Sequence, residues 1–122
     1  MEPAIAAAGR EPETALIVFP DIFTTAHHKQ IIALAQQYRL PAIYAYRFFP
    51  AAGGLISYGV DTPDLFRGMA GYVDRILKGK KPGDLPVQAP NKFDLVINLK
   101  TAKTMGVAIP DKLTALADEV IE

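Results

Sequence analysis

The sequence contains no cysteine, which excludes disulfide bonds and thiolate metal sites. Serine occurs once, at Ser57, outside any Gly-x-Ser-x-Gly turn of the kind that presents a hydrolase nucleophile. The only two histidines, His27 and His28, are adjacent and therefore point in different directions on a helix, which favours an exposed face over a metal site. No Gly-Lys-Ser/Thr phosphate loop is present. These absences predict no cofactor, no metal and no enzymatic activity.

The chain also lacks an excess of either charge and any long apolar run. Thirteen basic residues balance thirteen acidic ones, which argues against a nucleic-acid partner or an anionic membrane surface. No apolar run approaches the ~18 residues of a membrane span, so membrane insertion is not expected. The first 13 residues lack a basic segment followed by an apolar stretch, so they predict no signal peptide and, for the chain as written, a cytoplasmic location.

Short apolar runs alternate with helical patterns along residues 14–122, whereas residues 1–13 are expected to form a flexible or helical lead-in. Strands are expected at residues 15–19, 42–46, 55–58 and 93–98. Helices are expected from Thr24 or Thr25 to about residue 39, from Asp61 or Thr62 to about residue 78, before Gly106, and after Pro110–Asp111. The alternation predicts one α/β domain with four or five mostly parallel strands.

Two segments are rich in proline and glycine and carry no clear periodicity. Residues 47–54 are expected to form a loop, and residues 82–90 an extended connection with at most a short edge strand near Val87.

In open α/β sheets, ligands lie beyond the carboxyl ends of the strands, which selects three candidate segments here. Pro20 and Asp21 follow the first strand, and Asp21 could bind an amine, although a helix cap is the more common role of such a residue. Tyr46 and Arg47 follow the second strand, where aromatic faces and a guanidinium could hold a carboxylate. The alternative, which explains the segment equally well, is that its aromatic side chains pack into the core and that Arg47 lies in solvent.

The third candidate segment contains Ser57, Tyr58 and Gly59, in the stretch Gly-Gly-Leu-Ile-Ser-Tyr-Gly at residues 53–59. Its glycines would allow a ligand to approach the backbone closely, and the Ser57 hydroxyl could donate a hydrogen bond to it. From residue types alone, a plain turn is the favoured interpretation.

Several motifs in this order resemble one family. They are Ala-Leu-Ile-Val-Phe-Pro-Asp at 15–21, Leu-Pro-Ala-Ile-Tyr at 40–44, the 53–59 stretch, Tyr-Val-Asp-Arg-Ile-Leu-Lys-Gly at 72–79, and Leu-Pro-Val-Gln-Ala-Pro-Asn-Lys-Phe-Asp-Leu-Val-Ile-Asn-Leu-Lys at 85–100. The tail Ala-Asp-Glu-Val-Ile-Glu completes the pattern. Together they resemble bacterial ABC-transporter substrate-binding proteins of the tryptophan/tyrosine type.

This resemblance implies a periplasmic-binding-protein-like fold of type I, with two α/β lobes and a hinge. It implies a periplasmic location, a small solute such as an aromatic amino acid held between the lobes, and delivery to an ABC permease. By the same resemblance, Pro20, Asp21, Tyr46 and Arg47 would line the cleft, and residues 57–59 would lie where the chain crosses toward the other lobe.

Residues 14–122 resemble the C-terminal portion of such a protein, whereas residues 1–13 do not resemble the family at their position. Because one lobe cannot close a two-lobed cleft, weak or absent binding by this chain alone is expected. Exposed sheet edges would then favour a homodimer. The alternative function is a non-catalytic α/β oligomerisation module that binds no ligand independently.

Overall fold

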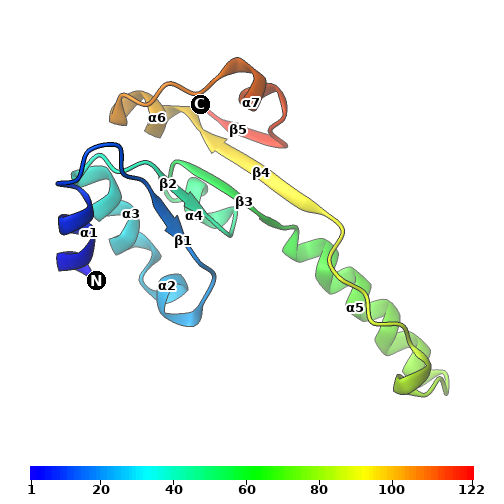
Figure 1. The fold of residues 1–122 in the computed structure, drawn as a ribbon. Helices are drawn as coiled ribbons and strands as arrows, with labels where there is room; N and C mark the ends of the chain where they lie inside the picture. Colours follow the sequence, from blue (N-terminus) through cyan, green and yellow to red (C-terminus); the bar gives the residue numbers. More distant parts are fainter. The chain divides into compact units, whose positions relative to one another are not determined.

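Five strands form one sheet in the computed structural model, which describes residues 1–122. The strands follow chain order across the sheet: β1 (Leu16–Val18), β2 (Ala42–Tyr44), β3 (Ile56–Val60), β4 (Phe93–Asn98) and β5 (Glu119–Ile121) (Figure 1). The chain divides into two compact units, one of residues 1–59 and 94–122 and the other of residues 60–93.

Most neighbouring strands of the sheet are parallel. Strand β1 pairs with β2, β2 with β3, and β4 with β5, each in parallel register. The exception is β4, whose last residue lies beside the start of β3 and whose first residue lies beside the end of β3: the N–H of Asn98 donates to the carbonyl of Leu55 (2.8 Å), and the N–H of Asp61 donates to the carbonyl of Lys92 (3.1 Å). Strand β4 therefore runs antiparallel to β3. The predicted α/β fold with a mostly parallel sheet is confirmed.

Eight helical segments connect or precede the strands. They are α1 (Glu2–Ala8), α2 (Ile22–Ala26), α3 (His28–Gln37), α4 (Phe48–Ala51), α5 (Thr62–Leu77), the 3₁₀ turn η1 (Pro82–Asp84), α6 (Leu99–Met105) and α7 (Asp111–Ala115). The helix expected from Thr24 begins earlier, at Ile22, and is divided at His27 into α2 and α3. Gly106 ends α6 with a φ of 71°, the left-handed conformation that favours glycine at this position.

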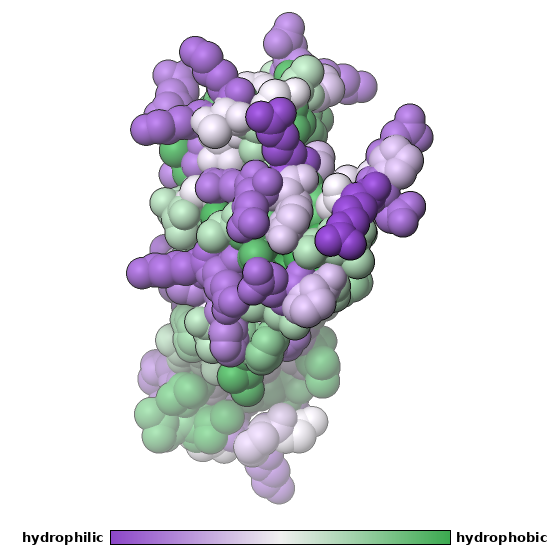
Figure 2. Space-filling view, turned by 90° about the vertical axis from the view of Figure 1, so that its left-hand side faces the viewer, coloured by the Kyte–Doolittle hydropathy of each residue, from purple (hydrophilic) through white to green (hydrophobic).

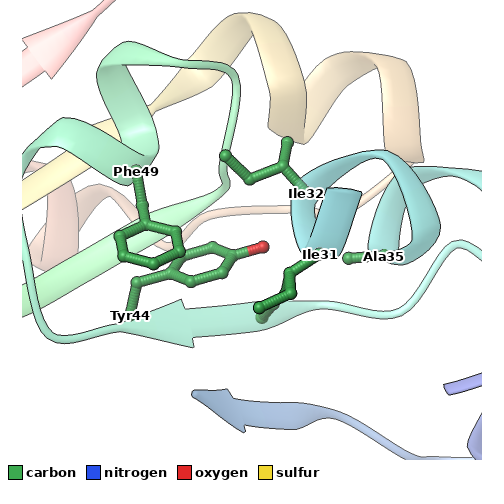
Figure 3. Close-up of a cluster of buried hydrophobic side chains, with 6 residues drawn as sticks. Ile31, Ile32, Ala35, Tyr44 and Phe49 are labelled. Carbon is green, nitrogen blue, oxygen red and sulfur yellow. The ribbon is translucent and has the colours of Figure 1, made fainter. Parts of the chain in front are cut away.

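The main core of the first unit lies between α3 and the middle of the sheet. Ile31, Ile32 and Ala35 of α3 pack on Tyr44 and Phe49, as Figure 3 shows. The rings of Tyr44 and Phe49 stack with centroids 4.5 Å apart. Burial raises the pKa of Tyr44 to about 12, because the charged phenolate would lose its hydration.

A second cluster fixes the N-terminal segment to the same unit. Ile5 of α1 is buried with Leu34 of α3 and Leu40, and Tyr38 packs against them. Gly9 follows α1 where a Cβ would lie 2.7 Å from the Cβ of Tyr38, so a larger residue would force the two segments apart. The lead-in is therefore helical over residues 2–8 and contributes one core side chain.

The second unit consists mainly of α5 and the segment that returns along it (Figure 1). The Asp61 side chain caps α5 by accepting from the N–H of Asp64 (3.0 Å), and Pro63 lies in the first turn. Asp61 also pairs with Lys92, and this hydrogen bond, with the one from Asp64, holds its pKa below the usual value. The Tyr72 hydroxyl donates to the carbonyl of Pro86, which fastens the returning segment to the helix.

Candidate functional site

The carboxyl ends of β1, β2 and β3 lie at one edge of the sheet, because these three strands are parallel neighbours. Four predicted site residues follow β1 or β2, namely Pro20, Asp21, Tyr46 and Arg47, and Tyr58 and Gly59 lie in the second half of β3. Since β4 and β5 run in the opposite direction, their first residues arrive at this edge too. We call this region the ligand edge.

Asp21 is exposed and forms the N-cap of α2. Its Oδ1 accepts from the backbone N–H of Thr24 (2.8 Å), and the Thr24 hydroxyl accepts from the N–H of Asp21 (3.2 Å). This reciprocal pair is a capping box with threonine in the third helical position. Asp21 therefore caps the helix, which is one of the two roles considered for it from the sequence. The cap uses Oδ1 and leaves Oδ2 without an assigned hydrogen bond.

Replacing Asp21 by alanine should loosen the start of α2. Loss of an N-cap acceptor costs about 1 kcal/mol, so the Thr24 amide should exchange with solvent about fivefold faster. Native-state hydrogen exchange measures this rate. Asp21→Asn is the matched control, because its side-chain oxygen can still accept from Thr24. An unchanged exchange rate in Asp21→Ala would show that the capping box contributes nothing.

Arg47 is held by two carboxylates that come from distant parts of the chain. Its guanidinium donates to Glu119 at the start of β5 and lies 3.7 Å from Asp94 Oδ2 at the start of β4. The Arg47 side chain is still 54% exposed, whereas that of Asp94 is only 12% exposed. A guanidinium has five N–H donors, so donors remain available to a ligand. The ligand edge thus carries one cation and three carboxylates, those of Asp21, Asp94 and Glu119.

Aromatic side chains accompany these charges. The rings of Tyr46 and Phe48 stack at 5.5 Å, and the His28 ring meets Phe48 edge to face at 5.4 Å. Phe23 and Tyr58 are more than half exposed. The face drawn in Figure 2, on the side where α1 lies in Figure 1, carries hydrophilic side chains with hydrophobic patches between them. Exposed rings beside charged groups can bind a ligand that has both an aromatic and an ionic part.

Ser57 and Gly59 lie in tightly packed surroundings that leave no room for larger side chains. Ser57 is 1% exposed, and its hydroxyl has no hydrogen-bond partner in the protein. The structure therefore places it beneath the ligand edge and not on it. At Gly59 a Cβ would lie 1.8 Å from the carbonyl oxygen of Ala45, so only glycine lets β3 approach the chain after β2 this closely.

The segment that follows Arg47 is held by polar contacts from the end of β4, from α6 and from α3. The Asn98 side chain donates to the carbonyl of Pro50 (2.9 Å) and accepts from the N–H of Thr101 (2.9 Å). The Thr101 hydroxyl and the Gln36 amide both donate to the carbonyl of Gly53 (2.9 and 2.8 Å). These bonds explain why residues 48–51, expected to be loop, form the short helix α4.

The surface has two hollows, and only one of them contains a predicted site residue. One of about 310 Å³ lies beside β1 and includes Phe19, Asp21 and Phe23, so it adjoins the ligand edge. A larger one of about 690 Å³ lies within the second unit, between α5 and residues 82–92. It contains none of the predicted site residues and therefore represents a separate feature.

The family described as "ABC transporter substrate binding protein" matches residues 1–121. The chain belongs to this family. The match begins at residue 1, so the expectation that residues 1–13 depart from the family pattern is wrong. No functionally curated protein matches the chain. None of the helices combines the length and the apolar composition that a membrane span requires.

Two solved structures of similar fold are more than 25% identical to this family member over the aligned residues. A conserved domain protein from Vibrio cholerae O1 biovar El Tor is 29% identical, with a TM-score of 0.85. An ABC domain from Streptococcus pneumoniae, solved in complex with L-Trp, is 26% identical, with a TM-score of 0.87. Each comparison covers 98% of this chain and 40% of the other.

A third solved structure, the ligand-free, open form of a substrate-binding protein with adhesive properties from Clostridium difficile, is 19% identical, with a TM-score of 0.70. At this identity it shows the fold alone. The comparison covers 99% of this chain and again 40% of the other. This member of the family therefore spans about two fifths of the length of these solved relatives.

The substrate-binding fold brings together two residues that the sequence did not single out, Asp94 and Glu119. Each stands at the start of a strand, and neither neighbours Arg47 in sequence. The only sequence signal for these two residues was an acidic side chain at the start of an apolar strand. That signal does not indicate a partner for Arg47 until the directions of the strands are known.

Proposed function

We propose that this chain contributes one side of the ligand site of an ABC importer's solute-binding component, and that the ligand is a small amine-bearing aromatic solute such as an aromatic amino acid. The observation that carries the proposal is the ligand edge itself. Exposed aromatic rings lie beside three carboxylates and one arginine at the carboxyl ends of three parallel strands. The L-Trp complex of the similar Streptococcus pneumoniae domain supports this ligand class.

Each part of such a ligand has a chemical counterpart at the edge. Phe23, Phe48 and Tyr58 offer ring faces, and Asp21 offers a carboxylate oxygen to an ammonium group. Arg47 offers its remaining N–H donors to a carboxylate, although it shares them with Glu119 and Asp94. The excess of carboxylates makes the ammonium the more strongly recognised end.

The role that follows is capture of a solute and its delivery to an ABC permease, at the periplasmic face of the membrane. A catalytic role has no support, because no nucleophile at the edge is paired with a base. Since the edge is open on one side, affinity in the millimolar range is expected for the chain by itself, which corresponds to about 4 kcal/mol of binding free energy.

Titration of the chain with L-tryptophan and indole-3-propionate, followed by NMR, tests this function. The two molecules share a ring and a carboxylate, but only tryptophan has the ammonium. We expect tryptophan to bind several-fold more tightly, and Arg47→Ala to weaken its binding about tenfold because a charge-assisted hydrogen bond is lost.

Arg67→Ala is the matched control, since Arg67 is also exposed and also pairs with one acidic residue, Asp64. Its binding should equal that of the unaltered chain. Equal affinities for tryptophan and indole-3-propionate would refute recognition of the amine. Equal affinities of Arg47→Ala and the unaltered chain would refute the role of Arg47.

A further inference from the structure

Arg47 is the one cation of the ligand edge, and both of its terminal nitrogens already face carboxylates of the same chain. Nη2 donates to Glu119, and Nη1 lies 3.7 Å from Asp94 Oδ2. A carboxylate that binds a guanidinium at two points uses two neighbouring nitrogens, and every such pair includes Nη1 or Nη2. A ligand carboxylate therefore has to compete with an acidic side chain before it can bind Arg47 at two points.

Asp94 is the less exposed of the two acidic partners and depends on Arg47. Its side chain is 12% exposed, whereas that of Glu119 is 45% exposed. A carboxylate that is shielded from water is destabilised when its counter-charge leaves, because hydration cannot replace the lost ion pair. Asp94 should therefore stay with Arg47 when a ligand arrives, which makes it a positioning residue.

Glu119 can leave Arg47 at little cost. About half of each of these two side chains is exposed, so their contact is an ion pair in water. Exposed ion pairs contribute little to stability, because water hydrates both groups as soon as they separate. Of the two carboxylates at Arg47, that of Glu119 is therefore the one that a ligand displaces.

The backbone of β5 is fixed without the Glu119 side chain. The three residues of this strand pair in parallel with the end of β4. Asp118 adds two bonds to Leu95: its Oδ2 accepts from the Leu95 N–H (2.8 Å), and its own N–H donates to the Leu95 carbonyl (2.9 Å). The Glu119 carboxylate can thus turn away from Arg47 while β5 stays in the sheet.

The two acidic side chains project from the same face of the β4–β5 pair. Glu119 is in register with Val96, and Asp94 lies two residues before Val96 on β4. Register partners of paired strands, and residues two apart on one strand, point to the same side of a sheet. When Glu119 turns away, Asp94 therefore still holds Arg47 over the same face.

We propose that Glu119 is a specificity-determining residue of the ligand edge, which competes with the ligand carboxylate for Arg47 and so disfavours aromatic acids that lack an amine. Glu119 acts at the same site, so this role rests on the proposed function. A solute with both charges is compensated for the competition, because its ammonium is attracted by the carboxylates at the edge. An aromatic acid without an ammonium group gains nothing from them and is repelled.

Replacing Glu119 by glutamine tests the competition, because the variant keeps the size of the side chain and removes its charge. The Arg47 Nε–H and the backbone amides are followed by NMR during titration with indole-3-propionate, tryptamine and L-tryptophan at constant ionic strength. We expect Glu119→Gln to bind indole-3-propionate about threefold more tightly, because no exposed ion pair has to be broken. Tryptamine, which has the ammonium but no carboxylate, should bind no more tightly than before.

Glu122→Gln is the matched control. It removes the same charge from an exposed residue nearby in sequence, and Arg47 pairs with Glu119 and not with Glu122. Its affinity for each of the three molecules should equal that of the unaltered chain.

Two results would overturn the competition. One is an affinity of Glu119→Gln for indole-3-propionate no higher than that of the unaltered chain, and the other is an equal gain for tryptamine or in Glu122→Gln. If the unaltered chain binds tryptophan while Glu119→Gln gains nothing, the competition fails and the proposed function stands. If tryptophan does not bind while Glu119→Gln gains affinity for indole-3-propionate, the proposed function fails and the competition at Arg47 stands.

Discussion

Replacing Gly59 by alanine should destabilise the first unit by about 3 kcal/mol or more. The added Cβ would lie 1.8 Å from the carbonyl oxygen of Ala45 and 2.8 Å from its carbonyl carbon. Both of these atoms belong to the backbone, so no side chain can rotate away to relieve the overlap. Strand β3 would have to move away from the chain after β2, which would disturb the sheet pairing at Tyr44 and Ser57. Urea unfolding measures the loss as a lower midpoint.

Gly71→Ala is the matched control for Gly59→Ala. Nothing lies within 4 Å of a Cβ at Gly71, which is in the interior of α5. Alanine is the better helix former by about 0.5–1 kcal/mol, so this variant should be neutral or stabilised. Equal unfolding midpoints for Gly59→Ala and the unaltered chain would show that β2 and β3 do not approach as closely as described.

Replacing Ile97 by alanine should cost about 2–5 kcal/mol. Ile97 lies in β4 and has no exposed surface, and Val96 beside it is 1% exposed. The shorter side chain loses its transfer free energy and leaves a cavity that a well-packed sheet fills only in part. The free energy of unfolding in urea measures the effect.

Ile22→Ala removes the same atoms from a side chain that is 90% exposed, and is therefore the control for Ile97→Ala. Its effect should stay within about 0.5 kcal/mol. Similar losses for the two variants would mean that β4 is not buried in the sheet.

The sequence predicted the elements whose signals are local. Apolar runs located β1 to β4, and the helical spacing with Asp61 and Pro63 at its start located α5 to within a residue. For α2 the capping residue was misjudged: the threonines were favoured as caps, whereas Thr24 is the third helical residue and Asp21 is the cap. A capping box can hold Asp or Thr at the cap, so a helix that begins after Asp21 and one that begins after Thr24 look alike in sequence.

Elements that depend on distant contacts were missed. Helix α4 contains Pro50 in a segment whose Gly53 and Gly54 indicate a loop, and it is stabilised by Asn98 from β4. Strand β5 is three residues long and begins with Glu119, and the Ala-Asp before it gives no strand signal; it forms by pairing with Val96 to Asn98. Short strands are specified by their neighbours more than by their own residues.

The gathering of the candidate residues at one edge of the sheet could be predicted, but the charges around them could not. The strand-end rule located six of the seven proposed residues at one edge. Arg47 was expected either to hold a ligand carboxylate or to lie in solvent, yet Glu119, 72 residues away, pairs with it because β5 begins near the level at which β2 ends. That contact depends on strand order and direction, which no local pattern encodes. Ser57 was predicted as a contact from its type, and alternation along β3 turns it inward.

Amide chemical-shift mapping during titration with L-tryptophan tests the central claim most directly. The account predicts saturable shifts at the ends of β1, β2 and β3, centred on Asp21, Arg47 and Tyr58, with no shifts along α5. Such a map is informative even when affinity is in the millimolar range. Shifts confined to α5 and the hollow beside it, or no saturable shift up to the solubility limit of tryptophan, would contradict the account.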